Sequence, residues 1–377
     1  MTNKHYAVFI DDDELMLKAV RRTARRLIPD WDTSFISEPG KWRELLLSDR
    51  TPDIVFCDYR MPGINGGEVL AQVASDCPLA IRVLMTGDTR DEVLVGYSGT
   101  AHSLINKPFS DELLADLLAQ VEKLNRLPFT HQQQECLGQL SYLPVLPEIV
   151  GQLRRALNDE QADTKKIADI IVQEPLIAAR ILQVANSAYL GFQRTTESLD
   201  EAIGRLGIQL LYALTVSFAI ESETAPLLPA KIHQSICDTT QNMASLGKAL
   251  AASFKCSAKA QQQVFTSAIL NGTGRLVLEI TRHKTPPLHA QLLQQLNAYP
   301  DTLITVFLLT LWCFPEQVVW PLLELESAPL ADEKAWINPL YFAYQYYKCG
   351  DNADKLADFM SSLPEPVKTA ILDNLGS

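Results

Sequence analysis

The sequence has no excess of positive charge, no C-x-x-C cysteine pair and no apolar run long enough to cross a membrane. Its formal net charge of −12 disfavours unspecific binding to the phosphate backbone of nucleic acids. Seven scattered cysteines suggest neither a disulfide framework nor a thiolate zinc site. The most apolar run, residues 303–314, is too short to span a bilayer, and no secretory signal opens the chain. We therefore predict a cytoplasmic protein with no nucleic-acid or membrane partner.

The 377 residues are 47% hydrophobic and 21% charged, which is enough for two or three globular domains. In the first third, short apolar runs rich in β-branched and aromatic residues alternate with segments of helical spacing. The runs are HYAVFI, DIVFC, AIRVLM and HSLIN. Buried strands separated by helices predict a doubly wound α/β domain with a parallel sheet.

Acidic and polar residues follow these predicted strands at the point where each strand ends. Asp11 to Asp13 follow the first run, Asp58 follows DIVFC, Thr86 closes the third run and Lys107 follows the last. Because ligands of such sheets bind beyond the carboxyl ends of the strands, we expect these groups to converge at one edge. Two carboxylates about 4 Å apart repel by about 4 kcal/mol at an effective dielectric constant of about 20. A magnesium ion would offset that repulsion, and its preferred ligands are oxygens.

Motifs in four separate stretches of the sequence then resemble a known family. The elements IDDDE, CDYRMPG, INGGEVL, LMTG and INKPF are similar to the receiver domain of two-component response regulators, over roughly residues 5–125. The resemblance implies a flavodoxin-like fold with five parallel strands. It also implies a histidine kinase or a phosphotransfer protein as the partner that supplies the phosphoryl group.

The resemblance assigns roles to individual residues. Asp58 is expected to be the phosphoacceptor. Asp11 and Asp12 are expected to hold Mg²⁺ together with Asp58 and the backbone carbonyl of Arg60. These residues make up the predicted metal site.

Two further residues are expected to contact the phosphoryl group itself. Thr86 would donate its hydroxyl and Lys107 would pair with a phosphoryl oxygen. The position three residues before the lysine, which is usually aromatic in the family, is Leu104. This departure leaves metal binding and phosphorylation unaffected but puts the usual coupling of Thr86 to an aromatic ring in doubt.

The remainder of the chain has the pattern of short helices joined by short loops. We predict a receiver domain at residues 1–125, a linker at 126–140 and an all-α bundle at 141–377. The motifs LPVLP, QEPLIAARIL, ANSAYLG and LDEAIGRLG resemble the opening of the HDOD domain, a helical module related to HD-type phosphohydrolases. Glu174 departs mildly from the aspartate that the family usually has there.

The residues argue against a metal-dependent hydrolase in this second half. HD-type hydrolysis needs histidines and an adjacent His-Asp pair to hold metal and activate water. The sequence contains no His-Asp dipeptide. Asn271 and Gly272 stand at the corresponding place in SAILNGTGRL, and Glu326 and Ser327 stand where related proteins often carry paired histidines. We therefore predict an output domain that binds rather than catalyses.

Two functions of different class remain at this point. In the first, phosphorylation of Asp58 switches the interactions of a non-catalytic helical domain with an unknown downstream protein or with a second copy of the chain. In the second, the helical half is a cyclic-dinucleotide phosphodiesterase gated by the receiver. A DNA-binding regulator is disfavoured, since no basic recognition helix is present.

Overall fold

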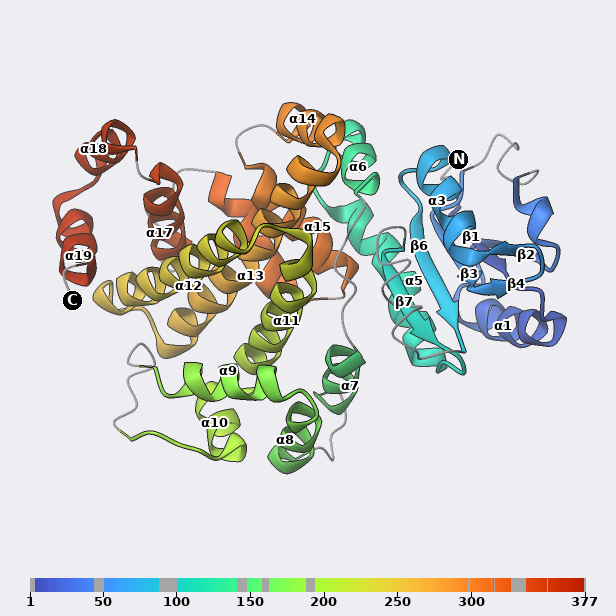
Figure 1. Cartoon of the computed structure of the whole chain (residues 1–377), viewed down its shortest axis with the longest axis horizontal. Coiled ribbons are helices and arrows are strands. Elements are labelled where there is room, and N and C mark those ends of the chain that lie inside the picture. Colours follow the sequence, from blue (N-terminus) through green and yellow to red (C-terminus); the bar gives the residue numbers. More distant parts are fainter. Residues whose placement is uncertain are drawn as a thin grey trace. The chain divides into compact units, whose positions relative to one another are not determined.

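The structure is a computed structural model of the chain, shown in Figure 1. Four features given above lie outside the residues that it describes: residue 141, where the predicted bundle begins, the LPVLP motif, Ser327 and the last four residues of ANSAYLG. The described ranges are 4–43, 51–87, 101–140, 148–157, 163–187, 194–296, 299–312, 314, 316–326, 337–350 and 352–375.

A five-stranded sheet forms the core of the first part of the chain. Its strand order is β2-β1-β3-β6-β7, and every neighbouring pair is parallel. This order is one of the two common doubly wound orders, so the predicted flavodoxin-like class is confirmed. The strands are β1 (Tyr6–Ile10), β2 (Asp32–Ile36), β3 (Ile54–Asp58), β6 (Ile81–Thr86) and β7 (Ser103–Asn106). A two-stranded antiparallel ribbon, β4 (Arg60–Met61) with β5 (Ile64–Asn65), follows β3.

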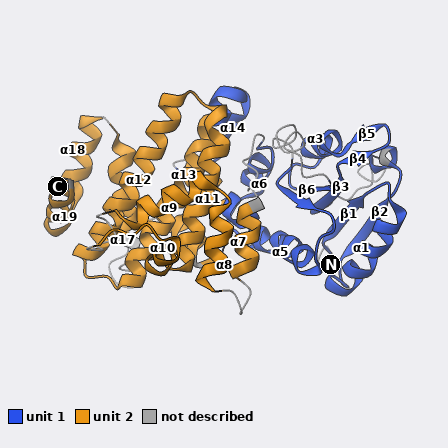
Figure 2. Ribbon diagram, turned by 60° about the horizontal axis from the view of Figure 1, so that its bottom comes forward, with its two compact units in different colours: residues 1–145, 280–300, 307–314 blue, residues 146–279, 301–306, 315–377 orange. Residues whose placement is uncertain are grey.

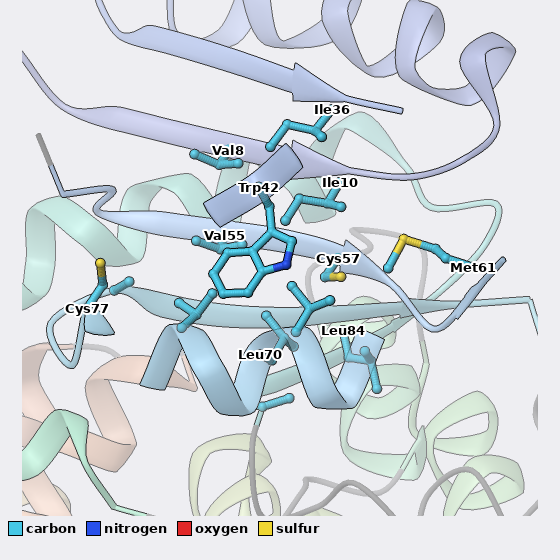
Figure 3. Close-up of a cluster of buried hydrophobic side chains, with 14 of the residues drawn as sticks. Val8, Ile10, Ile36, Trp42, Val55, Cys57, Met61, Leu70, Cys77 and Leu84 are labelled. Atoms are coloured by element: carbon cyan, nitrogen blue, oxygen red, sulfur yellow. The ribbon is translucent and has the colours of Figure 1, made fainter. Parts of the chain in front are cut away.

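Both faces of the sheet are packed with large side chains. On one face, the ring of Phe9 lies between those of Phe35 and Phe56 in stacked pairs with centroids 5.1 and 4.7 Å apart. On the other face, Trp42 is 3% exposed and lies among Val8, Ile10, Val55 and Leu70, as Figure 3 shows. Full burial of such a side chain stabilises a fold by roughly 1.5–3 kcal/mol.

The described helices are predominantly short, as the sequence pattern predicts. Those that accompany the sheet are α1 (Glu14–Leu27), α3 (Gly66–Asp76) and α5 (Asp111–Arg126). Those that follow are α6 (His131–Gly138), α7 (Glu148–Leu157), α8 (Thr164–Val172), α9 (Pro175–Ala185), α10 (Leu199–Leu206), α11 (Ile208–Thr224), α12 (Ala230–Ser253), α13 (Ala258–Lys284), α14 (Pro286–Gln295), α15 (Pro300–Leu311), α16 (Glu316–Leu323), α17 (Ile337–Cys349), α18 (Ala353–Ser362) and α19 (Glu365–Leu375). Short 3₁₀ turns are η1 (Pro39–Lys41), η3 (Ala225–Leu227) and η4 (Glu324–Glu326).

The chain divides into two compact units (Figure 2). The first comprises residues 1–145, 280–300 and 307–314, and the second comprises residues 146–279, 301–306 and 315–377. This division by contacts differs from the domain limits expected from the sequence, which remain a prediction.

The first unit contains α6 and α14 in addition to the sheet and its helices. Helix α6 begins at a capping box. The Thr130 hydroxyl accepts a hydrogen bond from the backbone N–H of Gln133, and the side chain of Gln133 accepts one from the backbone N–H of Thr130. Gln133 Nε2 also donates to the carbonyl oxygen of Gln295 on α14 at 3.3 Å. Much of the segment predicted as a linker is thus an ordered helix.

In the second unit, α11 is buried along most of its length, and Gly207 with φ 73° separates it from α10. Ser198 caps α10, and the carboxylate of Glu201 accepts a hydrogen bond from the Thr196 hydroxyl at 2.7 Å. No single described helix is long and apolar enough to span a membrane. The bent pair Leu199–Leu206 and Ile208–Leu227 meets the length and composition required of a broken span, as buried helices of folded proteins also can.

Candidate functional site

The row of acids after β1 divides into residues with different surroundings. Asp11 is 1% exposed, whereas Asp12 is exposed. Asp13 is the N-cap of α1, and its carboxylate accepts hydrogen bonds from the backbone N–H groups of Leu15 at 2.8 Å and Met16 at 3.3 Å. The backbone N–H of Asp13 in turn donates to Asp11 Oδ1 at 3.0 Å, which orients the Asp11 carboxylate. The neighbouring acids therefore have separate structural environments.

Asp58, the last residue of β3, lies close to the first two of these acids. One carboxylate oxygen from each of Asp11, Asp12 and Asp58 lies within 4.8 Å of the others. Because β1 and β3 are adjacent and parallel, their carboxyl ends share one edge of the sheet. Among the described residues, this is the only group of three His, Cys, Asp or Glu side chains close enough to share a metal ion. A set of carboxylate oxygens at this spacing fits Mg²⁺.

Lys107, which follows β7, joins the two buried carboxylates. Its Nζ lies 2.6 Å from Asp11 Oδ2 and forms an ion pair with Asp58 Oδ1. The backbone N–H of Lys107 donates to the carbonyl oxygen of Thr86 at 2.7 Å, which ties the residue to the end of β6. The peptide bond between Lys107 and Pro108 is cis. Residues from three strand ends thus meet around one ammonium group.

Burial and neighbouring charges in this pocket shift the pKa values of Asp58 and Lys107. Burial is the largest influence on Asp58 and raises its pKa, and the negative charge of Asp11 raises it further. Lys107 and the backbone N–H of Arg60 lower the pKa of Asp58, but the net result is a raised pKa. Burial lowers the pKa of Lys107, but its bonds to Asp11 and Asp58 outweigh burial and raise the net pKa. The pocket therefore keeps Lys107 charged and makes the ionised form of Asp58 costly.

The remaining predicted site residues lie next to this group. Thr86 ends β6 and is 1% exposed, and the register of β6 against β3 pairs Met85 with Asp58. The backbone N–H of Arg60 donates to Asp58 Oδ2 at 3.0 Å. Leu104 is partly buried and packs against the hydrophobic cluster of the sheet. The structure brings Asp11, Asp12, Asp58 and Lys107 together and places Thr86 at the same edge.

Gly66 belongs to the site, although the sequence pattern does not predict it as a site residue. A Cβ atom at this position would lie 2.1 Å from the backbone oxygen of Asp58, so α3 can start this close to β3 only with glycine at its first position. The Gly66 N–H also donates to the carbonyl oxygen of Tyr59 at 2.9 Å. The only sequence feature that marks this position is the pair of glycines in INGGEVL.

Two family models match successive parts of the chain. The family model of the response regulator receiver domain matches residues 7–119, and that of the HDOD domain matches residues 143–326. The chain carries a receiver domain followed by an HDOD domain. The two occur in the predicted order, and the pairing supports a response regulator.

Curated relatives resemble the receiver domain. The hydrogenase transcriptional regulatory protein HoxA of Cupriavidus necator is 32% identical over 124 residues, which cover 32% of this chain and 25% of that protein. Response regulator MprA of Mycolicibacterium vanbaalenii is 33% identical over 120 residues, which cover 31% of this chain and 48% of that protein. The chain thus spans between a quarter and half of the length of these relatives.

A solved structure resembles the fold over a larger share of the chain. It is a putative metal-dependent phosphohydrolase from Shewanella amazonensis, with a TM-score of 0.50 and 18% identity, and the match covers 69% of this chain and 95% of that chain. At this identity the likeness shows the fold alone.

Within the HDOD domain, the place of the missing His-Asp pair is tightly packed. Asn271 and Gly272 lie in α13 and both amide atoms of Asn271 are buried without a hydrogen-bond partner among the described residues. A Cβ atom on Gly272 would lie 2.6 Å from both Oγ1 and Cγ2 of Thr240 on α12. Thr240 therefore fills the space that an acidic side chain at position 272 would need. Residues Asn271, Gly272 and Thr240 provide no carboxylate or imidazole for a metal, so this donor set does not fit an HD-type metal centre.

A small cavity lies beside these residues in the HDOD domain. The cavity has a volume of about 30 Å³, which is enough for one or two water molecules. Inside it, Arg180 pairs with Glu221 at 2.6 Å and its guanidinium carbon lies 3.8 Å from the ring centroid of Phe218. Burial, with the charge of Glu221, raises the pKa of Cys237 to about 12, so this cysteine is a neutral thiol.

Proposed function

We propose that this chain is a response regulator in which Asp58 accepts a phosphoryl group from a phosphohistidine on a histidine kinase or a phosphotransfer protein. The observation that carries the proposal is the convergence of Asp11, Asp12 and Lys107 on Asp58 at the carboxyl edge of the parallel sheet. Lys107 is also the cation that the receiver resemblance assigns to a phosphoryl oxygen.

The transfer step uses the groups that surround Asp58. A carboxylate oxygen of Asp58 forms a bond to phosphorus while the N–P bond of the phosphohistidine breaks. The electron pair of that bond stays on the imidazole nitrogen, which takes up a proton from water. Lys107 moves its ion pair from the carboxylate to a phosphoryl oxygen, and the hydroxyl of Thr86 donates to another.

The same pocket suits a divalent cation. Asp11, Asp12, Asp58 and the backbone carbonyl of Arg60 would hold Mg²⁺, which when bound supplies positive charge to the oxygens of the transferring group. The buried carboxylate of Asp11 is already oriented by the N–H of Asp13 at 3.0 Å. This preorganisation reduces the ordering that metal binding requires.

For the HDOD domain, we favour a binding role that phosphorylation controls. Coupling between two sites typically amounts to 1–3 kcal/mol, which shifts a partner equilibrium without remaking the fold. The downstream partner that we propose is either a protein of unknown identity or a second copy of the chain. We propose that the chain acts in the cytoplasm and uses Mg²⁺ as its cofactor. The alternative, a receiver-gated cyclic-dinucleotide phosphodiesterase, is disfavoured by Asn271 and Gly272 at the metal-binding dipeptide.

Intact-mass spectrometry tests the phosphoacceptor. With phosphoramidate and Mg²⁺, the wild-type chain should gain a single adduct of about 80 Da. Asp58→Asn should gain none, and Asp30→Asn, which removes an exposed carboxylate outside the pocket, should behave as wild type. An adduct that persists in Asp58→Asn would place the modification elsewhere and contradict the proposal.

A second experiment separates the two roles of the HDOD domain. The full chain is incubated with cyclic di-GMP and Mn²⁺, with and without beryllofluoride as a mimic of the Asp58 phosphoryl group. If the HDOD domain only binds a partner, no cyclic di-GMP is hydrolysed to its linear form with or without beryllofluoride. The set of proteins that the chain captures from a lysate should then differ between the two conditions. Hydrolysis that depends on the mimic would favour the phosphodiesterase instead.

A further inference from the structure

A cluster of arginines on α1 stands out in a chain whose net charge is −12. The segment RRTARR places Arg21, Arg22, Arg25 and Arg26 in the second half of this helix. Arg26 forms an ion pair with Asp111. Arg21 and Arg25 are four residues apart, so they lie on the same face of the helix. Neither has an ion-pair partner within the part of the chain that the structure describes.

These two arginines border an open groove of about 400 Å³ beside strand β2. The groove is lined by Arg21, Arg25, Thr33, Ser34 and Phe35. The guanidinium carbon of Arg21 lies 4.6 Å from the ring centroid of Phe35, which holds the planar group flat against the aromatic face. Among the described residues, no carboxylate lines the groove.

The hydroxyl of the groove comes from the edge of the sheet. Strand β2 is the outer strand, paired with β1 alone in the described sheet. Thr33 and Phe35 are two residues apart on β2, so their side chains share one face of the sheet, and Thr33 offers a hydroxyl to a ligand beside Arg21. The side chain of Ser34 points to the opposite face, where its Oγ accepts a hydrogen bond from the hydroxyl of Tyr6 at 2.9 Å.

The helix dipole explains only part of this cluster. Positive side chains in the last turn of a helix are stabilised by its carbonyl end, which accounts for Arg25 and Arg26. Arg21 lies before that turn, where the dipole effect has fallen off. Its position over Phe35 is unrelated to the helix end.

We propose that this groove binds a phosphate-bearing small ligand. Two guanidinium groups can each bind a pair of phosphate oxygens in a bidentate manner, and the hydroxyl of Thr33 can donate to a remaining oxygen. The volume lies within the range of small-molecule sites, about 300–1,000 Å³. An acidic peptide would need a longer row of cations than these two arginines. The groove shares no residue with the pocket around Asp58, so this inference does not depend on the proposed phosphoryl transfer.

Calorimetric titration of the full chain with pyrophosphate and with ADP tests this site. The Asp58→Asn background without Mg²⁺ removes competition from the acidic pocket. We expect both ligands to bind, and binding to weaken at least 10-fold in Arg21→Gln/Arg25→Gln. Arg22→Gln is the matched control, because it removes the same charge beside the groove without touching its lining, and it should change the affinity less than 2-fold. Arg21, Arg22 and Arg25 are exposed, and thermal unfolding checks that each variant is folded.

Further arms identify the source of the phosphate and the outcomes that would overturn the proposal. Binding of pyrophosphate and ADP favours a free ligand, whereas vesicles containing phosphatidylinositol phosphate that bind more tightly than either would assign the same groove to a lipid headgroup. Three results would overturn the proposal: no binding of any phosphate probe, an equal loss in Arg22→Gln and the double variant, or binding of a polyglutamate peptide without binding of pyrophosphate.

Discussion

Arg82 Nη1 donates a 3.0 Å hydrogen bond to the carbonyl oxygen of Gly138, a residue 56 positions further along the chain. Arg82 lies in β6 of the receiver sheet and is 1% exposed, and Gly138 is the last residue of α6. Burial lowers the pKa of Arg82 to about 10, which still leaves it charged at neutral pH. A buried cation therefore faces the carbonyl end of α6, where a helix favours positive charge.

The first prediction concerns the contact that brings α6 to this arginine. A Cβ atom on Gly138 would lie 1.8 Å from the backbone oxygen of Pro78, so Gly138→Ala must displace backbone. We expect a loss of about 1–3 kcal/mol in the free energy of unfolding, measured by urea denaturation. Gly204→Ala is the control, because nothing lies within 4 Å of a Cβ there and the residue is inside α10. It should stabilise by about 0.5–1 kcal/mol. Equal effects of the two variants would mean that α6 is not held against Pro78.

The second prediction concerns His102, which contacts Arg82. Arg82 Nη2 lies 2.7 Å from His102 Nε2, and the backbone N–H of Arg82 lies 3.1 Å from Nδ1. A neutral imidazole has one acceptor nitrogen, so it can accept only one of these donors at a time. Burial, and then the charge of Arg82, lower the pKa of His102 well below its usual range. The edge contact with the ring of Phe307 at 6.1 Å adds no charge.

This shift predicts how stability depends on pH. The unfolded chain binds a proton at His102 below a pH of about 6.5, whereas the folded chain does not until the pH is much lower. The contribution of His102 is therefore fully present above about pH 6.5 and is lost as the pH falls from there through the folded pKa. Unfolding free energies at pH 5 and pH 7 should differ less in His102→Gln than in wild type. His131→Gln, at an exposed histidine, is the comparison variant that removes an imidazole without touching Arg82. If His102→Gln retains the whole difference, other groups cause it.

The sequence predicted the acidic pocket because its geometry follows from a local pattern. Once short buried runs alternate with helices, the ends of parallel strands must share an edge, and Asp11, Asp58 and Lys107 each follow such a run. The pattern did not separate the roles within the acid row. That Asp13 caps α1 while Asp11 faces Lys107 depends on where the helix begins, which a run of four acids leaves open.

Close approaches between segments that are distant in the sequence could not be predicted from the local pattern of residues. Gly66 and Gly138 are required by backbone oxygens of Asp58 and Pro78, and nothing in the local spacing of either glycine reveals those neighbours. These contacts are set by packing in three dimensions, so a helical or strand period cannot encode them.

The third prediction tests the metal pocket without phosphorylation. A ligand that binds only the folded state stabilises it by about 2.7 kcal/mol at 100 times its dissociation constant. Mg²⁺ should therefore raise the unfolding midpoint of the wild-type chain. Asp12→Asn should reduce this rise, because Asp12 is exposed and its loss removes a ligand while leaving the core intact. Differential scanning calorimetry gives both midpoints, with Asp30→Asn as the control that keeps the full response. A full rise in Asp12→Asn would remove that residue from the metal site.

The fourth prediction asks whether the HDOD domain lacks only metal ligands or also the room for them. Asn271→His/Gly272→Asp restores the His-Asp dipeptide, but the new Cβ at position 272 meets Thr240 at 2.6 Å. We expect the variant to lose about 1–3 kcal/mol in unfolding free energy and to bind Mn²⁺ no more tightly than wild type. Adding Thr240→Ala should recover part of the stability, because it removes the two Thr240 atoms that lie 2.6 Å from the new Cβ. It should still give no metal site, since two ligands alone do not make one. Tight Mn²⁺ binding by the double variant would instead mean that further ligands are already in place, which would revive the phosphodiesterase function.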